Sequence, residues 1–191
     1  MTYGIMYNIT PSGLIRQIGG TWDENDARIE GWLRGFPEFA KWRNDVQERA
    51  LTTGELETVT GRKRRWSLVT PDNTHSIRGQ ASNYPIQSLA NDLLLMSMIE
   101  VNRALRERGW GRVVLMVHDS LEMEIREDVL PEAAQLVHDI MTRPKFPTRL
   151  PYHPIEIKVG PSWGNNEKFK VEVPDWIDES FLKELPPSLR P

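Results

Sequence analysis

The sequence predicts an α+β fold, in which helices pack against short antiparallel strands. Apolar residues recur at intervals of three and four between residues 85 and 108, which is typical of a long helix with one buried face. A continuous apolar segment, 113–117, precedes a segment of alternating apolar and acidic residues, 121–125, which is typical of a β-hairpin. A length of 191 residues with 39% hydrophobic content is enough to bury a core.

The composition excludes several classes of protein. The chain has no cysteine, which excludes a disulfide framework, a thiolate zinc site and a cysteine nucleophile. Its apolar runs are short and its first residues do not resemble a signal peptide, so we expect a cytoplasmic protein without a membrane partner. The net charge is −3, yet residues 61–112 contain nine Lys and Arg against four Asp and Glu. This local basic zone could bind nucleic acid.

Caps and helix breakers define the elements expected in the N-terminal part. Residues 1–8 carry aromatic side chains at helical spacing without a preceding cap, so a helix is expected from the start. Ser12 is expected to cap a short helix that Gly19 ends. Thr21 begins a capping box for the next helix, and Pro37 interrupts that helix before another resumes.

The rest of the chain combines expected strands and helices. Residues 54–66 favour strands or loops and end in the most basic run of the sequence. The long helix, 85–108, ends at a glycine, and a hairpin, a second helix and a last strand follow. We therefore expect three parts: helices and the basic segment over residues 1–66, the long helix and hairpin over 67–165, and a tail without clear periodicity over 166–191.

Two polar residues, His118 and Asp119, lie at the tip of the expected hairpin, directly after a strand that is too apolar to be exposed. One interpretation is a turn aspartate that hydrogen-bonds its own backbone. The other is a metal ligand, since Mg²⁺ binds one or two carboxylates together with substrate phosphates. The second interpretation needs another acid nearby, and the sequence supplies no obvious one.

Further candidates lie in the basic zone and near the N-terminus. Arg62 and Arg64, in the run 61–65, could neutralise phosphates or belong to a solvated face. Tyr3 and Tyr7 could stack on bases or pack in the core.

A pair of amides, Asn83 and Gln87, is spaced by four residues at the start of the long helix. The two side chains could contact base edges in the minor groove, where every base pair offers an acceptor, or cap the helix.

Five segments together resemble family A DNA polymerases, the group of bacterial DNA polymerase I and phage replicases. They are Tyr3-Gly4-Ile5-Met6-Tyr7, Glu57-Thr58-Val59-Thr60-Gly61-Arg62-Lys63-Arg64-Arg65, Asn83-Tyr84-Pro85-Ile86-Gln87-Ser88, Val117-His118-Asp119 and Gly160-Pro161-Ser162-Trp163-Gly164. In this order they are similar to the end of the motif B helix, a Glu-Thr-x-x-Gly-Arg-Arg-Arg segment, an Asn-x-Pro-Ile-Gln segment, motif C and a closing Gly-x-x-Trp. The resemblance covers about residues 2–165, and it implies part of the fingers followed by a palm with an antiparallel sheet.

The resemblance also implies roles for single residues. Asp119 would be one of two carboxylates that hold a pair of Mg²⁺ ions during nucleotidyl transfer, and His118 would contact the primer terminus. Asn83 and Gln87 would contact the minor groove of the primer-template DNA, with Arg62 and Arg64 as further DNA-binding residues. The incoming dNTP would meet Tyr3, while Tyr7 would pack at the templating position.

This chain departs from the family pattern at several positions. Ser120 stands where motif C has a Glu, Asn8 follows the motif B Tyr in place of a Gly, and Gly79 occupies the position of an expected Arg, for which Arg78 could compensate. Motif A and the motif B Lys are not in the sequence. We therefore expect the C-terminal half of a split polymerase, inactive alone and dependent on an N-terminal half that carries both motifs, in a bacterial or phage-infected cell.

Two further hypotheses concern the origin and activity of the chain. Thr2 suits the residue after a split intein, so the halves could be spliced, or they could associate without ligation. A non-catalytic nucleic-acid-binding or scaffold module that keeps the polymerase fold is the alternative to an enzyme half.

Overall fold

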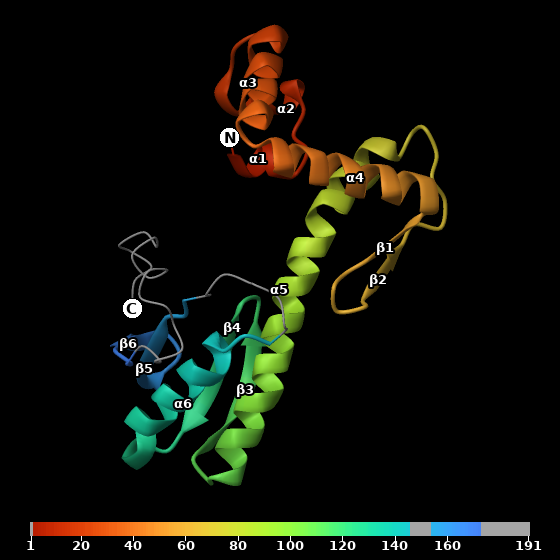
Figure 1. Cartoon of the computed structure of the whole chain (residues 1–191). Helices are drawn as coiled ribbons and strands as arrows, with labels where there is room; N and C mark the ends of the chain where they lie inside the picture. The colour runs from red at the N-terminus through yellow and green to blue at the C-terminus, as the bar shows by residue number, and fades with distance from the viewer. Residues whose placement is uncertain (1, 146–153, 173–191) are drawn as a thin grey trace. The chain divides into compact units, whose positions relative to one another are not determined.

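The structure, a computed structural model, describes residues 2–145 and 154–172. The chain divides into two compact units, Met1–Asp92 and Leu93–Pro191 (Figure 1). This boundary lies inside a long helix and differs from the one expected after residue 66.

Four helices open the first unit: α1 (Thr2–Met6), α2 (Pro11–Ile18), α3 (Trp22–Gly35) and α4 (Pro37–Thr53). All four are expected from the sequence, but the cap of α2 is not Ser12. Thr10 caps it, because the Thr10 hydroxyl accepts a hydrogen bond from the Gly13 N–H at 3.1 Å. The capping box at Thr21 is confirmed, with both reciprocal hydrogen bonds to Glu24 formed.

Two apolar clusters hold the first unit together. One joins the first three helices through buried side chains: Ile5, Leu14, Ile29 and Leu33. The other joins α4 to the hairpin formed by β1 (Glu55–Glu57) and β2 (Lys63–Arg65), and to the start of α5. Its buried members are Ala50, Leu56, Ile77 and Ala81.

Helix α5 spans Thr74–Glu107 and therefore begins eleven residues before the expected start. Pro85 was expected to open the helix and instead lies inside it. A proline inside a helix removes one hydrogen bond and costs about 3 kcal/mol. The additional turns bury Ile77 and Ala81, which are 2% and 0% exposed, and this burial offsets part of that cost.

The C-terminus of α5 is closed by Gly109, as expected. Gly109 has a φ of +65°, its N–H donates to the Arg106 carbonyl, and the Trp110 N–H donates to the Leu105 carbonyl. These two bonds define a Schellman motif, in which a left-handed residue favours glycine.

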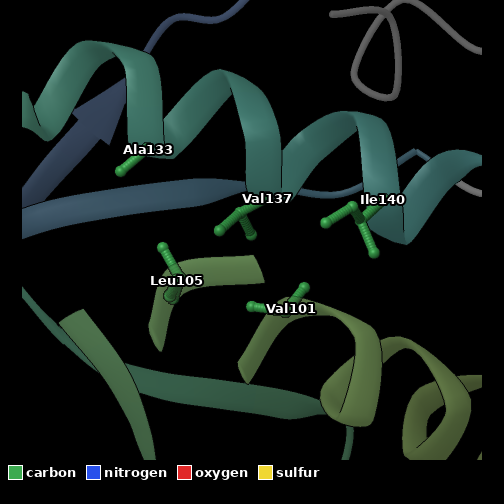
Figure 2. Packing of buried hydrophobic residues seen from close by; sticks show 5 residues of the cluster. All are labelled: Val101, Leu105, Ala133, Val137 and Ile140. Atoms are coloured by element: carbon green, nitrogen blue, oxygen red, sulfur yellow. The ribbon is translucent and has the colours of Figure 1, made fainter. Parts of the chain in front are cut away.

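The second unit combines the last turns of α5 with a hairpin and a further helix. Strands β3 (Gly111–Val117) and β4 (Ser120–Ile125) pair antiparallel, and α6 (Leu130–Thr142) follows a short 3₁₀ turn, Glu127–Val129. Figure 2 shows the core between the two helices, where side chains of α5 point towards those of α6. Its buried members are Val101, Leu105, Ala133, Val137 and Ile140.

The outer face of β3 corrects one expectation. The strand was expected to be too apolar for exposure, yet Val114, Leu115 and Met116 are 47%, 45% and 36% exposed. The helices cover the face that carries Val113, and a bulge interrupts the register between Val113 and Leu115. Leu115, opposite Glu122, lies on the other face, whereas Met116, opposite Leu121, lies on the same face as Val113. A two-stranded sheet packed on one side leaves its other face uncovered.

A last hairpin pairs β5 (Ile157–Ser162) with β6 (Asn165–Phe169). Strand β5 is expected, whereas β6 lies partly in the segment expected to be a tail, of which residues 173–191 lie outside the described residues. The Gln135 side chain on α6 exchanges two hydrogen bonds with the Glu172 backbone, at 3.0 and 2.8 Å. Within the described ranges, no helix is both long and apolar enough to cross a membrane.

Candidate active site and nucleic-acid interface

The β3–β4 hairpin presents His118 and Asp119 as its two turn residues. Val117 pairs with Ser120, so only these two residues connect the strands, and both are exposed. His118 has a φ of +53°, which a two-residue hairpin turn requires at its first position. The Ser120 hydroxyl donates to the Val117 carbonyl at 3.1 Å. The turn is therefore fixed by its register and by Ser120, and Asp119 extends from it into solvent.

Tyr3 in α1 and Tyr7 directly after it are exposed, at 76% and 40%, while Ile5 between them is fully buried. The core interpretation of these aromatic residues is therefore wrong for the described chain. Asn8 follows with a φ of +65°, and its side-chain oxygen accepts a hydrogen bond from the Gln47 amide at 3.3 Å. Asparagine tolerates this left-handed conformation, which explains how it can replace a glycine here.

A hollow of about 310 Å³ lies along one face of α5 in the first unit. The lining residues on the helix follow the helical spacing of three and four, and the β1–β2 hairpin adds one more. They are Arg64, Gln80, Asn83, Tyr84, Gln87 and Ser88. Asn83 is the tenth residue of α5, so it is not a helix cap.

Two polar atoms of this hollow are buried without a hydrogen-bond partner in the described chain, the Asn83 Oδ1 and the Ser88 Oγ. Leaving a buried polar atom unpaired is costly, and an external donor or a water relieves that cost. The hollow therefore offers an amide and a hydroxyl group that can hydrogen-bond to a ligand or to water.

Arg64 is held in place at the edge of this hollow. Its Nη2 donates to Gln80 Oε1 at 2.5 Å, and its guanidinium lies over the rings of Trp66 and Tyr84 at 5.3 and 5.9 Å. The Trp66 indole N–H donates to the same Gln80 oxygen at 3.0 Å. An exposed guanidinium fixed in this way can bind an anion with little loss of side-chain entropy.

Arg62 has a different environment, because it pairs with Asp92 on α5 at 2.5 Å. The hydrogen bond from Arg62 lowers the pKa of Asp92 below its ordinary value, against the opposing effect of burial. The same hydrogen bond raises the pKa of Arg62. The two arginines that the sequence groups together thus face different partners.

The chain is also similar to known proteins. Residues 1–165 match the profile of DNA polymerase family A. The chain belongs to this family. Family A relatives include a thermostable DNA polymerase I of Thermus filiformis, 30% identical over 170 residues, and DNA polymerase I of Chloroflexus aurantiacus, 31% identical over 166 residues. Each match covers 85% of this chain, but only 20% and 18% of those relatives.

A solved family A structure also matches. The POL domain of Pol1 from M. smegmatis, in complex with DNA primer-template and dNTP, aligns with a TM-score of 0.68 and 30% identity. The alignment covers 74% of this chain and 26% of that one. The α+β fold, and its similarity to a family A polymerase domain, are therefore confirmed.

Family A polymerases use divalent metal ions, and Asp119 has the right donor chemistry for one. In residues 2–145 and 154–172, however, no group of three or more His, Cys, Asp or Glu side chains could hold a metal ion.

Nothing in the sequence indicated two residues that fix the β1–β2 hairpin to α5, Gln80 and Asp92. Gln80 precedes the expected start of α5, so the sequence did not predict that it shares a helix face with Asn83 and Gln87. The contact of Asp92 with Arg62 spans thirty residues and left no local signal.

Proposed function

We propose that this chain forms the C-terminal part of a family A DNA-directed DNA polymerase, which catalyses template-directed nucleotidyl transfer. The observation that carries the proposal is the exposed Asp119 at a two-residue turn between antiparallel strands, within a chain whose residues 1–165 match the family. A rigid hairpin tip is a suitable support for a carboxylate that must meet a metal ion and a primer end.

Asp119 would bind Mg²⁺ together with a second carboxylate. Two bound ions would activate the primer 3′-hydroxyl and stabilise the departing pyrophosphate. A site with one carboxylate binds the ion weakly and leaves the triphosphate poorly oriented. The 191 residues alone are therefore expected to be inactive.

Five other residues would bind the substrates, which are primer-template DNA and dNTPs. His118, next to Asp119, would contact the primer terminus. Tyr3 would lie against the sugar of the incoming nucleotide, and Tyr7 at the templating position. Asn83 and Gln87 would reach the minor groove, where acceptor atoms recur at every base pair, so that the shape of a pair is sensed without its sequence.

The missing carboxylate would come from an N-terminal polymerase half, either earlier in the same polypeptide or in a separate chain. That half would also supply a lysine that binds the triphosphate. The exposed face of β3 supports this proposal, because Val114 and Leu115, at the bulge, leave apolar side chains exposed on a small sheet. The partner half would cover this face.

Primer extension tests the proposal. The chain is mixed with an N-terminal half that carries motif A and the motif B Lys, and dNTP incorporation into a primer-template is followed. Extension by the mixture and none by either part is the expected result. Extension by this chain alone, or none by the mixture, contradicts it. An intact-mass measurement of the active complex shows whether the halves are spliced or only associated.

A further inference from the structure

The loop that connects β1 and β2 contacts α5 through a buried carboxylate, Asp92. Asp92 is only 6% exposed. Arg62 donates to its Oδ1 from Nη2 at 2.5 Å and to its Oδ2 from Nε at 3.3 Å, and the Thr60 hydroxyl donates to its Oδ2 at 2.5 Å. Both carboxylate oxygens are thus occupied by one loop, in the geometry that makes arginine–carboxylate pairs specific.

The same loop is also organised internally. Thr58 is 7% exposed, and its hydroxyl accepts a hydrogen bond from the Arg62 N–H at 3.2 Å and lies 2.7 Å from the Thr60 hydroxyl. The Tyr84 hydroxyl on α5 donates to the Arg62 carbonyl at 2.9 Å. Gly61 has a φ of +81°, which lets the chain turn between the two bonded threonines and Arg62. The loop is therefore fixed through both its backbone and its side chains.

Arg64 lies two residues beyond Arg62, and it lines the hollow beside Asn83 and Gln87. Because Arg62 is attached to α5, the strand that follows it starts from a fixed point. The position of Arg64 depends on that point as well as on Gln80. Without the contact at Asp92, the hairpin would keep its strand pairing and the bond from Tyr84 to the Arg62 carbonyl, but it would lose both side-chain bonds that fix this end to the helix.

We infer that Asp92 is a positioning residue for DNA binding: by holding Arg62 and Thr60 it places Arg64 at the hollow that Asn83 and Gln87 line. The choice of DNA as ligand rests on the proposed function. The motif suggests Arg62 as a DNA ligand. We infer instead that Arg62 fixes the loop to Asp92 and does not contact the phosphates.

The change in DNA affinity after removal of the Asp92 charge distinguishes a positioning role from a direct electrostatic role. DNA is a polyanion, so removing a carboxylate near its binding surface should tighten binding if charge alone matters. If Asp92 positions the hairpin, Asp92→Asn weakens binding instead, because the competent geometry becomes less populated. A fall of that population to about one fifth weakens the apparent affinity about fivefold.

The experiment compares variants of the full chain on a primer-template duplex by fluorescence anisotropy at several KCl concentrations. We expect Asp92→Asn to bind about fivefold more weakly. The matched control is Glu55→Gln, which removes a carboxylate from the same hairpin, where it pairs with Lys63 and Arg65 in solvent. That control should bind with equal or higher affinity. Equal or tighter binding by Asp92→Asn overturns the inference.

Hydrogen exchange provides a second readout that needs no DNA. Asp92→Asn should speed amide exchange in residues 58–66, while α1 to α3 remain as protected as in the wild type. Should Asp92→Asn fail to fold, Thr60→Val removes one bond to Asp92 without a charge change and should act in the same direction. Unchanged exchange in residues 58–66 overturns the inference. If the wild type does not bind the duplex, the proposed function fails, while exchange still decides the role of Asp92.

Discussion

The exposed face of β3 leads to a quantitative prediction about association with the N-terminal half. Burial of a whole Val, Leu or Met side chain stabilises by about 1.5–3 kcal/mol. On this face Val114 and Leu115 are 47% and 45% exposed, so covering both contributes about 1.4–2.8 kcal/mol. Leu115 accounts for about half of this amount, and a charge placed there adds a desolvation cost.

We choose the substitution Leu115→Lys, because the register of the hairpin allows a lysine at this position without destabilising the chain on its own. Leu115 lies opposite Glu122 on β4, and opposite charges across a strand pair are stabilising by about 0.2–1 kcal/mol. The melting temperature of the chain alone should therefore change by no more than about 4 °C. Association with the N-terminal half should weaken at least about tenfold, which corresponds to about 1.4 kcal/mol.

Isothermal titration calorimetry measures the association, and circular dichroism measures the melting temperature. Leu68→Lys is the control, since it makes the same chemical change at a leucine that is 69% exposed in the first unit. The control should bind the N-terminal half as the wild type does. Wild-type affinity in Leu115→Lys would show that this face of β3 is not the docking surface.

Three further predictions follow from the core and the interface. Leu105→Ala, at a fully buried position, should lower the free energy of unfolding by about 2–5 kcal/mol in urea denaturation, and a loss below 1 kcal/mol would contradict the assigned core. Because the pKa of Asp92 is lowered from 3.8, its stabilising effect is complete above that value and is lost as the pH falls through the folded-state pKa. The stability difference between the wild type and Asp92→Asn should thus be present at pH 6 and vanish in strong acid; a difference independent of pH would refute the ion pair. Arg64→Ala should reduce the salt dependence of duplex binding by about one phosphate contact, whereas Gln87→Ala should weaken binding with an unchanged salt slope.

Local signals predicted most of the elements, but they failed where long-range packing decided the outcome. The capping box at Thr21 and the hairpin around Asp119 depend on neighbours in sequence, and both formed as expected. Helix α5 extends through Pro85 because its earlier turns bury Ile77 and Ala81 against distant residues. The preference of proline for helix starts could not reveal this burial.

Strand β6 shows a second limit of local reasoning. Its sequence, Asn165–Phe169, has four polar residues and one aromatic residue, so no alternation marks it as a strand. It forms through backbone pairing with β5, in which Ile157 lies opposite Phe169. Backbone hydrogen bonds do not depend on the side-chain pattern, and strand propensity depends strongly on context.

The sequence predicted the residues of the candidate site that lie in the family-like segments, but not the contacts between them. Arg64, Asn83 and Gln87 stand in the segments that resemble the family, and the structure brings all three to one hollow. Arg62 belongs to the same segments, but its pairing with Asp92 across thirty residues could not be inferred from spacing. The division between an arginine that faces the hollow and one that fixes the loop is a property of the folded chain.

Primer extension by the reconstituted polymerase with Asp119→Ala in this chain tests most directly whether the β3–β4 hairpin carries a catalytic carboxylate. The variant pair should bind the primer-template duplex as tightly as the wild-type pair and incorporate no dNTP above background. Wild-type extension with Asp119→Ala would contradict the claim that this hairpin carries a catalytic carboxylate, and would favour a non-catalytic nucleic-acid-binding or scaffold module.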